Sequence, residues 1–104
     1  MVVAFTVIPM GESEELKEKI AEIIKIVDES GLDYKLGSMQ TTIEGENWDE
    51  VMGVVRKCHE KAMESVPRCL TSVTIDDRKG FSGRLEGKVK DVQAVLCDRE
   101  LKVE

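Results

Sequence analysis

The chain has 104 residues, which is enough for a single domain, residues 1–104, with a small hydrophobic core. Charged residues make up 35% and hydrophobic residues 41% of the sequence, a composition that excludes a disordered chain. The net charge of -6 argues against nucleic acid as a partner, because phosphates are bound by Lys and Arg. It is compatible with a neutral or cationic small ligand.

Membrane, secretion and metal signals are absent from the sequence. No apolar run approaches the roughly 20 residues that span a bilayer, and the apolar start at residues 1–8 has no basic region of a signal peptide. The three cysteines, Cys58, Cys69 and Cys97, are odd in number and widely spaced. That pattern fits reduced thiols better than a disulfide framework, and it gives no zinc signature. We therefore expect a cytoplasmic protein with no membrane partner and no metal.

The first strand is predicted at residues 2–8, where β-branched and apolar side chains fill both alternating faces. The helices of a two-layer fold cover only one face of a sheet. We expect a second subunit to cover the other face, and the alternative is that a third helix of the same chain folds over it. Residues 9–12 are expected to form a loop. The first helix is predicted at residues 13–30, with its apolar stripe and a C′ glycine in Leu16, Ile20, Ile23, Ile24, Val27 and Gly31.

A β-hairpin is predicted next, with strands at residues 32–36 and 39–44. Gly37-Ser38 is the two-residue turn expected of a type II′ hairpin, which places Gly first. Along the return strand one face carries Met39, Thr41 and Ile43, and the other carries Gln40, Thr42 and Glu44.

A second helix follows, with Asn47 as its N-cap and Glu50 three residues further on, as in a capping box. Pro67 ends this helix near Ser65. Its predicted buried stripe comprises Trp48, Val51, Met52, Val55, Cys58, Ala62, Met63 and Val66. Residues 69–75 alternate as a fourth strand, and the third helix is indicated by the spacing of Leu85, Val89, Val92 and Leu96.

The element order β-α-β-β-α-β-α predicts an α+β fold, a ferredoxin-like βαββαβ sandwich with an extra C-terminal helix. Right-handed crossovers place the first and third strands at the centre of an antiparallel sheet of order 4-1-3-2, with both crossover helices on one face.

No catalytic constellation is present. His59 is the only histidine and lacks the partners that define a metal or nucleophile site. Among the carboxylates near the second helix, Glu44 alone is not explained by the helix dipole. Tyr34 and Trp48 are most simply an edge-strand aromatic and a core anchor. They also flank a hairpin rich in hydroxyl groups, and aromatic rings with an acid can hold a flat cationic heterocycle.

The segment Gly37 to Glu46 (GSMQTTIEGE), followed by Trp48-Asp49-Glu50-Val51 and Cys58-His59-Glu60, resembles the small thiamine-binding-protein family. The resemblance covers nearly the whole chain. It implies a ferredoxin-like fold, sheet-mediated dimers that assemble into tetramers, and thiamine or a related hydroxymethylpyrimidine compound bound near the hairpin and a subunit interface. By position, the implied ligand-binding residues are Tyr34, Gly37, Ser38, Thr41, Thr42, Glu44 and Trp48.

The leading hypothesis is therefore a non-enzymatic homo-oligomer that binds thiamine and uses no cofactor. One alternative is an enzyme of thiamine salvage or small-aromatic turnover with Glu44 or His59 as base. Another is an anion-responsive or structural oligomer with Arg68 and Arg78 at its interface.

Overall fold

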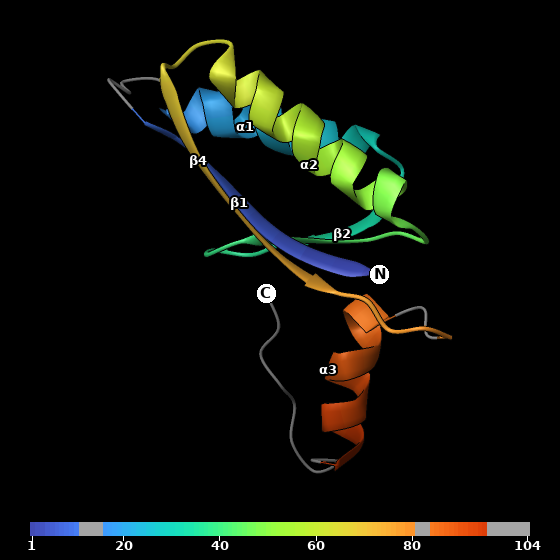
Figure 1. The fold of residues 1–104 in the computed structure, drawn as a ribbon. Helices are drawn as coiled ribbons and strands as arrows, with labels where there is room; N and C mark the ends of the chain where they lie inside the picture. Colours follow the sequence, from blue (N-terminus) through green and yellow to red (C-terminus); the bar gives the residue numbers. More distant parts are fainter. Residues whose placement is uncertain (11–15, 81–83, 96–104) are drawn as a thin grey trace.

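The strands of the chain form one antiparallel sheet, covered on one face by two helices (Figure 1). The computed structural model describes residues 1–10, 16–80 and 84–95. In chain order the elements are β1 (Val2–Met10), α1 (Leu16–Glu29), β2 (Asp33–Leu36), β3 (Thr41–Glu44), α2 (Trp48–Met63), β4 (Arg68–Asp76) and α3 (Arg84–Val95). The sheet order β2-β3-β1-β4 confirms the predicted ferredoxin-like topology and the extra C-terminal helix.

The hydrophobic core lies between the sheet and the pair α1 and α2. Alternate residues of β1 point toward these helices, and Val3 and Phe5 are buried there with Ile43 of β3. The helices contribute Ile23, Val27, Val51, Val54, Val55, Cys58 and Ala62. None of the described helices is long and apolar enough to cross a membrane.

The start of α2 confirms the predicted cap. Asn47 has an extended backbone, and its side-chain Oδ1 accepts a hydrogen bond of 3.0 Å from the backbone N–H of Glu50. The predicted core position of Trp48 is wrong, because its side chain is 54% exposed. A helical side chain leans toward the helix N-terminus, so the first residue of α2 points past the helix end instead of onto the core.

Strand β1 is longer than predicted. It pairs with β4 from Val2↔Asp76 to Met10↔Arg68, so the loop expected at residues 9–10 is strand. Its pairing with β3 stops at Phe5↔Thr41. Within the described ranges, residues 6–10 of β1 therefore have a strand on one side only. A free edge is where a sheet tolerates proline, which explains how Pro9 lies inside β1.

The turn of the hairpin also differs from the prediction. Leu36 pairs with Thr41, and the N–H of Gly37 donates to the carbonyl of Gln40 at 2.9 Å, which leaves Ser38 and Met39 as the two-residue turn. Gly37 does not have the positive φ that a type II′ turn requires; among the described residues only Gly31 and Gly80 do. The pairing moves by two positions, so each side chain keeps its predicted face.

The sheet face that points away from α1 and α2 is called the open face below. Helix α3 lies on this side and contacts β2 and β3 (Figure 1). It leaves apolar side chains on the β1 and β4 half accessible, since Ile8 is 47% and Leu70 is 51% exposed. Within the described part of the chain, the third helix therefore covers only a part of the open face.

Gly45, which follows β3, and Gly53, inside α2, give a matched stability test. A Cβ added at Gly45 would lie 2.7 Å from Cγ1 of Val51, a buried and stiff side chain, whereas a Cβ at Gly53 would meet nothing within 4 Å. We expect Gly45→Ala to lower the free energy of unfolding by about 1 to 3 kcal/mol. Gly53→Ala should raise it by about 0.5 to 1 kcal/mol, because alanine is the better helix former. Urea denaturation of both variants checks this, and equal effects would contradict the close approach at Gly45.

Candidate functional site

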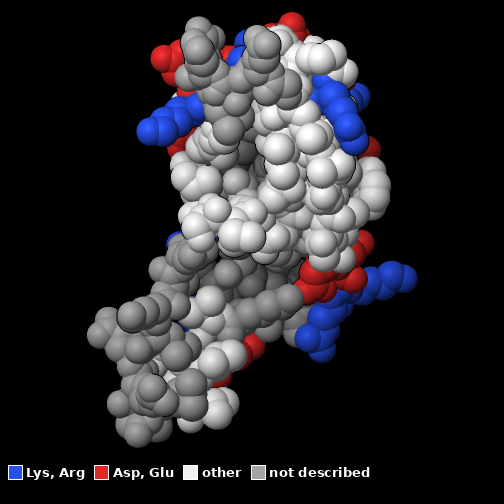
Figure 2. Space-filling view, turned by 90° about the vertical axis from the view of Figure 1, so that its left-hand side faces the viewer, with Lys and Arg blue, Asp and Glu red and all other residues white. Residues whose placement is uncertain are grey.

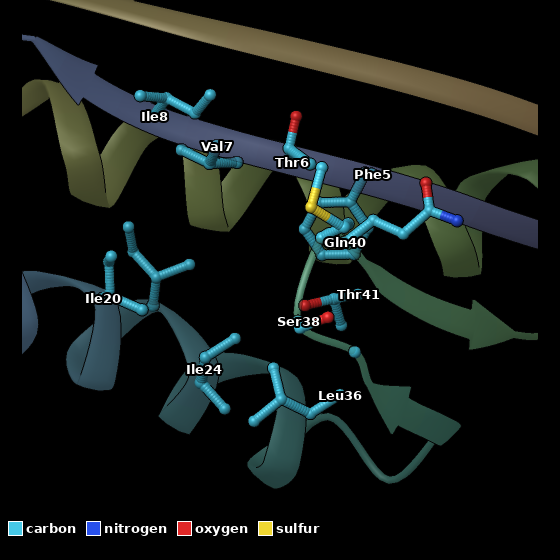
Figure 3. A pocket seen from close by; sticks show the side chains of 13 residues that line it. Phe5, Thr6, Val7, Ile8, Ile20, Ile24, Leu36, Ser38, Gln40 and Thr41 are labelled. Atoms are coloured by element: carbon cyan, nitrogen blue, oxygen red, sulfur yellow. The ribbon is translucent and has the colours of Figure 1, made fainter. Parts of the chain in front are cut away.

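A pocket of about 260 Å³ lies where the tip of the hairpin faces α1 and the free edge of β1 (Figure 3). Ile20 and Ile24 of α1 form one wall, and Leu36 begins the hairpin wall. The remaining lining residues are Phe5, Thr6, Val7, Ile8, Ile23, Gly37, Ser38, Met39, Gln40 and Thr41. None of these residues is charged. An apolar concavity with a few polar groups is the usual form of a small-molecule site.

The pocket exists because β3 is shorter than β1. Residues on both faces of β1, Thr6 and Ile8 on one and Val7 on the other, line it together. Successive side chains of a strand point to opposite faces, so a cavity that touches both sets runs along the strand edge. The space that a longer β3 would fill is therefore the cavity.

Thr41 places a polar group in this apolar cavity. It is only 6% exposed and is the buried polar residue of the described chain. Its hydroxyl has no hydrogen-bond partner among the described residues. Every side-chain oxygen or nitrogen that is fully enclosed in the described part of the chain does have a partner, so the Thr41 hydroxyl is not fully enclosed. The Thr41 hydroxyl must therefore open onto the pocket, where it can bond to a ligand.

The seven predicted binding residues do not meet at one place in a single chain. Gly37, Ser38 and Thr41 line the pocket. Thr42 and Glu44 are on the open face, because they pair with Ala4 and Val2, whose side chains alternate with the buried ones of β1.

Tyr34 and Trp48 lie away from the pocket lining. Tyr34 is half-buried in the edge strand β2, as predicted, and its hydroxyl donates a hydrogen bond of 2.7 Å to Oδ1 of Asp28. This bond to a carboxylate raises the pKa of Tyr34. Trp48 stands exposed beyond the end of β3 that lies away from the hairpin turn, and it is likewise not a lining residue of the pocket.

The surface at this end of the molecule is mainly uncharged. Figure 2 faces the side on which the hairpin turn lies in Figure 1, and it shows a broad area of neutral side chains with Lys, Arg, Asp and Glu toward the margins. The neutral lining of the pocket is thus continuous with a largely neutral surround. Recognition here depends on shape, apolar contact and hydrogen bonds more than on ion pairing.

The residues proposed for catalysis are separated by the sheet. Nδ1 of His59 shares a hydrogen bond of 2.6 Å with Oγ1 of Thr71 on the helix side, and Sγ of Cys69 lies 3.5 Å from the same oxygen. Glu44 is on the open face, so it cannot act with His59 in one chain. No group of three or more His, Cys, Asp or Glu side chains in the described ranges is arranged to hold a metal ion.

The two arginines of the anion hypothesis are also far apart. Arg68 begins β4 and Arg78 follows its end. An extended strand rises about 3.3 Å per residue, which separates them by about 30 Å. One chain therefore offers no shared anion site for the pair.

Sequence reasoning missed the apolar half of the pocket. Ile20 and Ile24 were expected in the core, but Ile20 is exposed and Ile24 half-buried, and both face the cavity. The one signal for the free edge was Pro9, because proline inside an apolar strand segment marks an edge without a hydrogen-bonding neighbour.

A family model described as thiamine-binding protein matches residues 3–93. The chain belongs to the thiamine-binding protein family. It is 36% identical over 100 residues to a UPF0045 protein of Mycobacterium bovis, covering 96% of this chain and 98% of the relative. A UPF0045 protein of Bacillus subtilis, YqgV, is 33% identical over 97 residues, covering 88% of this chain and 92% of the relative.

Two solved structures share the fold of this chain. A hypothetical protein of Methanocaldococcus jannaschii superposes with a TM-score of 0.78 at 25% identity, over 88% of this chain and 93% of the other. A Thermotoga maritima protein described as a candidate for thiamine biosynthesis or salvage gives a TM-score of 0.75 at 28% identity, over 88% of this chain and 96% of the other. These matches confirm the family resemblance and the ferredoxin-like fold.

The cysteines of this family member give a test of the packing of α2. Cys58 is fully buried, and burial raises the pKa of its thiol to about 11, whereas Cys69 is half-buried. With Cys97 replaced by Ser, iodoacetamide at pH 8 should label Cys69 and spare Cys58, as read by peptide mass spectrometry. Equal labelling would show that α2 does not stay closed over the core.

Proposed function

We propose that the chain is a non-enzymatic binding protein for thiamine or a related hydroxymethylpyrimidine compound, and that it acts as a homo-oligomer. Membership of the thiamine-binding protein family supports the ligand class. The observation that carries the site is the buried Thr41 hydroxyl, which opens onto an apolar pocket and has no partner among the described residues. The first five residues of the segment Gly37 to Glu46, on which the family resemblance rests, line this pocket.

The pocket suits one flat heterocycle. Its volume of about 260 Å³ is slightly below the roughly 300 to 1,000 Å³ of common ligand sites, so it can hold a single ring more readily than a larger ligand. The aminopyrimidine ring would lie between the isoleucines of α1 and Leu36, with its polar edge toward Thr41. Because no lining residue is charged, the cationic thiazolium ring of thiamine would point to solvent, and the net charge of -6 would favour its approach.

The remaining predicted residues lie outside the pocket and would contact the ligand only in an assembled protein. Thr42 and Glu44 lie on the open face, and Trp48 is exposed at the start of α2. A subunit packed against the open face would cover Thr42 and Glu44 and bring them near atoms of another chain. In this arrangement Glu44 accepts a hydrogen bond from a ligand amino group, and Trp48 or Tyr34 offers a ring face. Aromatic side chains are enriched at subunit interfaces, which is consistent with an exposed Trp48.

The two adjacent threonines separate the pocket from the open face. Thr41→Val should weaken thiamine binding about tenfold, because the substitution removes a hydroxyl bonded to ligand without creating a cavity. Its stability should change little, since that hydroxyl has no protein partner in the described chain. Thr42→Val is the matched comparison and should lose less affinity than Thr41→Val, because Thr42 lies on the open face and reaches a ligand only across a subunit interface. Calorimetric titration with thiamine measures both, and a larger loss for Thr42→Val would move the site to the open face.

Light scattering tests the assembly. The open face exposes Ile8 and Leu70, and α3 exposes Val92 and Val95, which is apolar surface suited to burial between subunits. We expect the wild-type protein to be a dimer or larger. Leu70→Glu should shift it toward monomer, whereas Met63→Glu, at another exposed apolar side chain on the last residue of α2, should not. A wild-type monomer at micromolar concentration would contradict the homo-oligomer.

A further inference from the structure

The backbone groups of β1 point in known directions because one pair of residues fixes the pattern. The N-terminal nitrogen of Met1 donates to the carbonyl of Gly45 at 2.9 Å, and the N–H of Gly45 donates to the carbonyl of Met1 at 3.1 Å. The N–H and C=O of one strand residue point to the same side, and this side alternates along an antiparallel strand. Val3 and Phe5, two and four residues on, therefore also point toward β3.

The same alternation directs Val7 and Pro9 to the side where β3 has ended. Pairing of β1 with β3 stops at Phe5↔Thr41. Even-numbered residues such as Thr6 and Ile8 bond to β4 instead. Pro9 has no N–H, so Val7 is the one residue of this stretch that presents both a donor and an acceptor to the free edge.

The free edge at Val7 borders the pocket. Val7 is a lining residue and is half-buried, and the described chain supplies no hydrogen-bond partner on this side of its backbone. Its neighbours around the cavity include the unpartnered, buried hydroxyl of Thr41, whose residue closes the last β1–β3 pair (Figure 3). Backbone polar groups in folded proteins are almost always paired with protein, water or ligand, so the unpaired N–H and C=O at this half-buried edge are available to a ligand that enters the pocket.

We propose that the backbone N–H and C=O of Val7 form the hydrogen-bonding edge of the ligand site and bind a planar group that carries an acceptor beside a donor. The inference rests on the proposed function and specifies how the same pocket reads its ligand. An aminopyrimidine has this pattern, because a ring nitrogen accepts and the neighbouring exocyclic amino group donates. The ligand then takes the place of the missing length of β3, with its flat faces against the apolar walls.

The amino group of the ligand is then the feature that the Val7 edge selects. A pyrimidine with an oxo group in place of the amino group carries a protonated ring nitrogen and a carbonyl, which reverses donor and acceptor. The order of the N–H and C=O at Val7 is fixed by the ladder with β4, so the reversed pattern leaves both groups mismatched in the same ring orientation. The site should therefore prefer thiamine over its oxo analogue, oxythiamine.

A proline substitution removes the donor alone. The N–H of Val7 makes no ladder bond to β4, so Val7→Pro keeps the sheet, as Pro9 already does on the same edge. Val7→Ala is the matched control because it loses the side chain and keeps the N–H. Thermal unfolding of both variants confirms that they are folded before binding is measured.

Calorimetric titration with thiamine and with oxythiamine then decides the inference. We expect wild type and Val7→Ala to favour thiamine over oxythiamine by about tenfold. Val7→Pro should lose about tenfold in thiamine affinity relative to Val7→Ala, and its preference for the amino form should disappear. Equal thiamine binding by the two variants would overturn the role of Val7 while leaving thiamine binding intact. Absence of binding by the wild type to both compounds would overturn the proposed function as well.

Amide hydrogen exchange gives a readout that needs no variant. The Val7 N–H should exchange fast in the ligand-free protein and slow at least about tenfold on saturation with thiamine, measured by NMR. The Ile8 N–H, which bonds to β4, is the internal control and should be protected in both states. Protection of Val7 without ligand would mean that this edge is already paired, for example by a second copy of the chain, and would overturn the proposal.

Discussion

The difference in length between neighbouring strands is the constraint from which the site follows. β1 and β4 each have nine residues and pair along their whole length, whereas β3 has four. The sheet is therefore complete at one end and two-stranded at the other. Because helix α1 faces the incomplete end, the vacancy is lined by apolar side chains of α1, β1 and the hairpin and stays partly open to solvent. The pocket, the tolerated proline and the unpaired backbone at Val7 are three results of this one mismatch.

Alternation along the short strand β3 divides the family segment between two environments. Thr41 and Ile43 point into the layer between sheet and helices, and Thr42 and Glu44 point to the open face. Two threonines that are adjacent in sequence thus serve different surfaces. A ligand in the pocket contacts the first set, and only an assembled protein can bring the second set to a ligand. The distinction between a one-chain site and a shared site is therefore built into a four-residue strand.

Much of the fold was predictable from the sequence, because local signals there agree with tertiary packing. Asn47 caps α2, Gly31 has the positive φ expected after α1, and the order of elements allows one ferredoxin-like topology. The site was less accessible because it depends on relative strand lengths. Gly37-Ser38 signalled a turn one residue too early, and nothing in the spacing of β1 shows where β3 leaves it. Trp48 matched the helical stripe but lies at the first residue, where the direction of the side chain overrides periodicity.

The pairing of β1 with β4 also has a consequence for how the chain folds. Val2 pairs with Asp76, so the longest strand pairing of β1 can form only after β4, the last strand, has been made. Contacts so distant in sequence are slow to close, because the intervening chain must first be ordered. During synthesis β1 emerges early, with two apolar faces and both edges unpaired. The nascent chain therefore carries an apolar strand with an unpaired edge until β4 has left the ribosome, and the short hairpin β2-β3 can pair with only the first half of β1 in that interval.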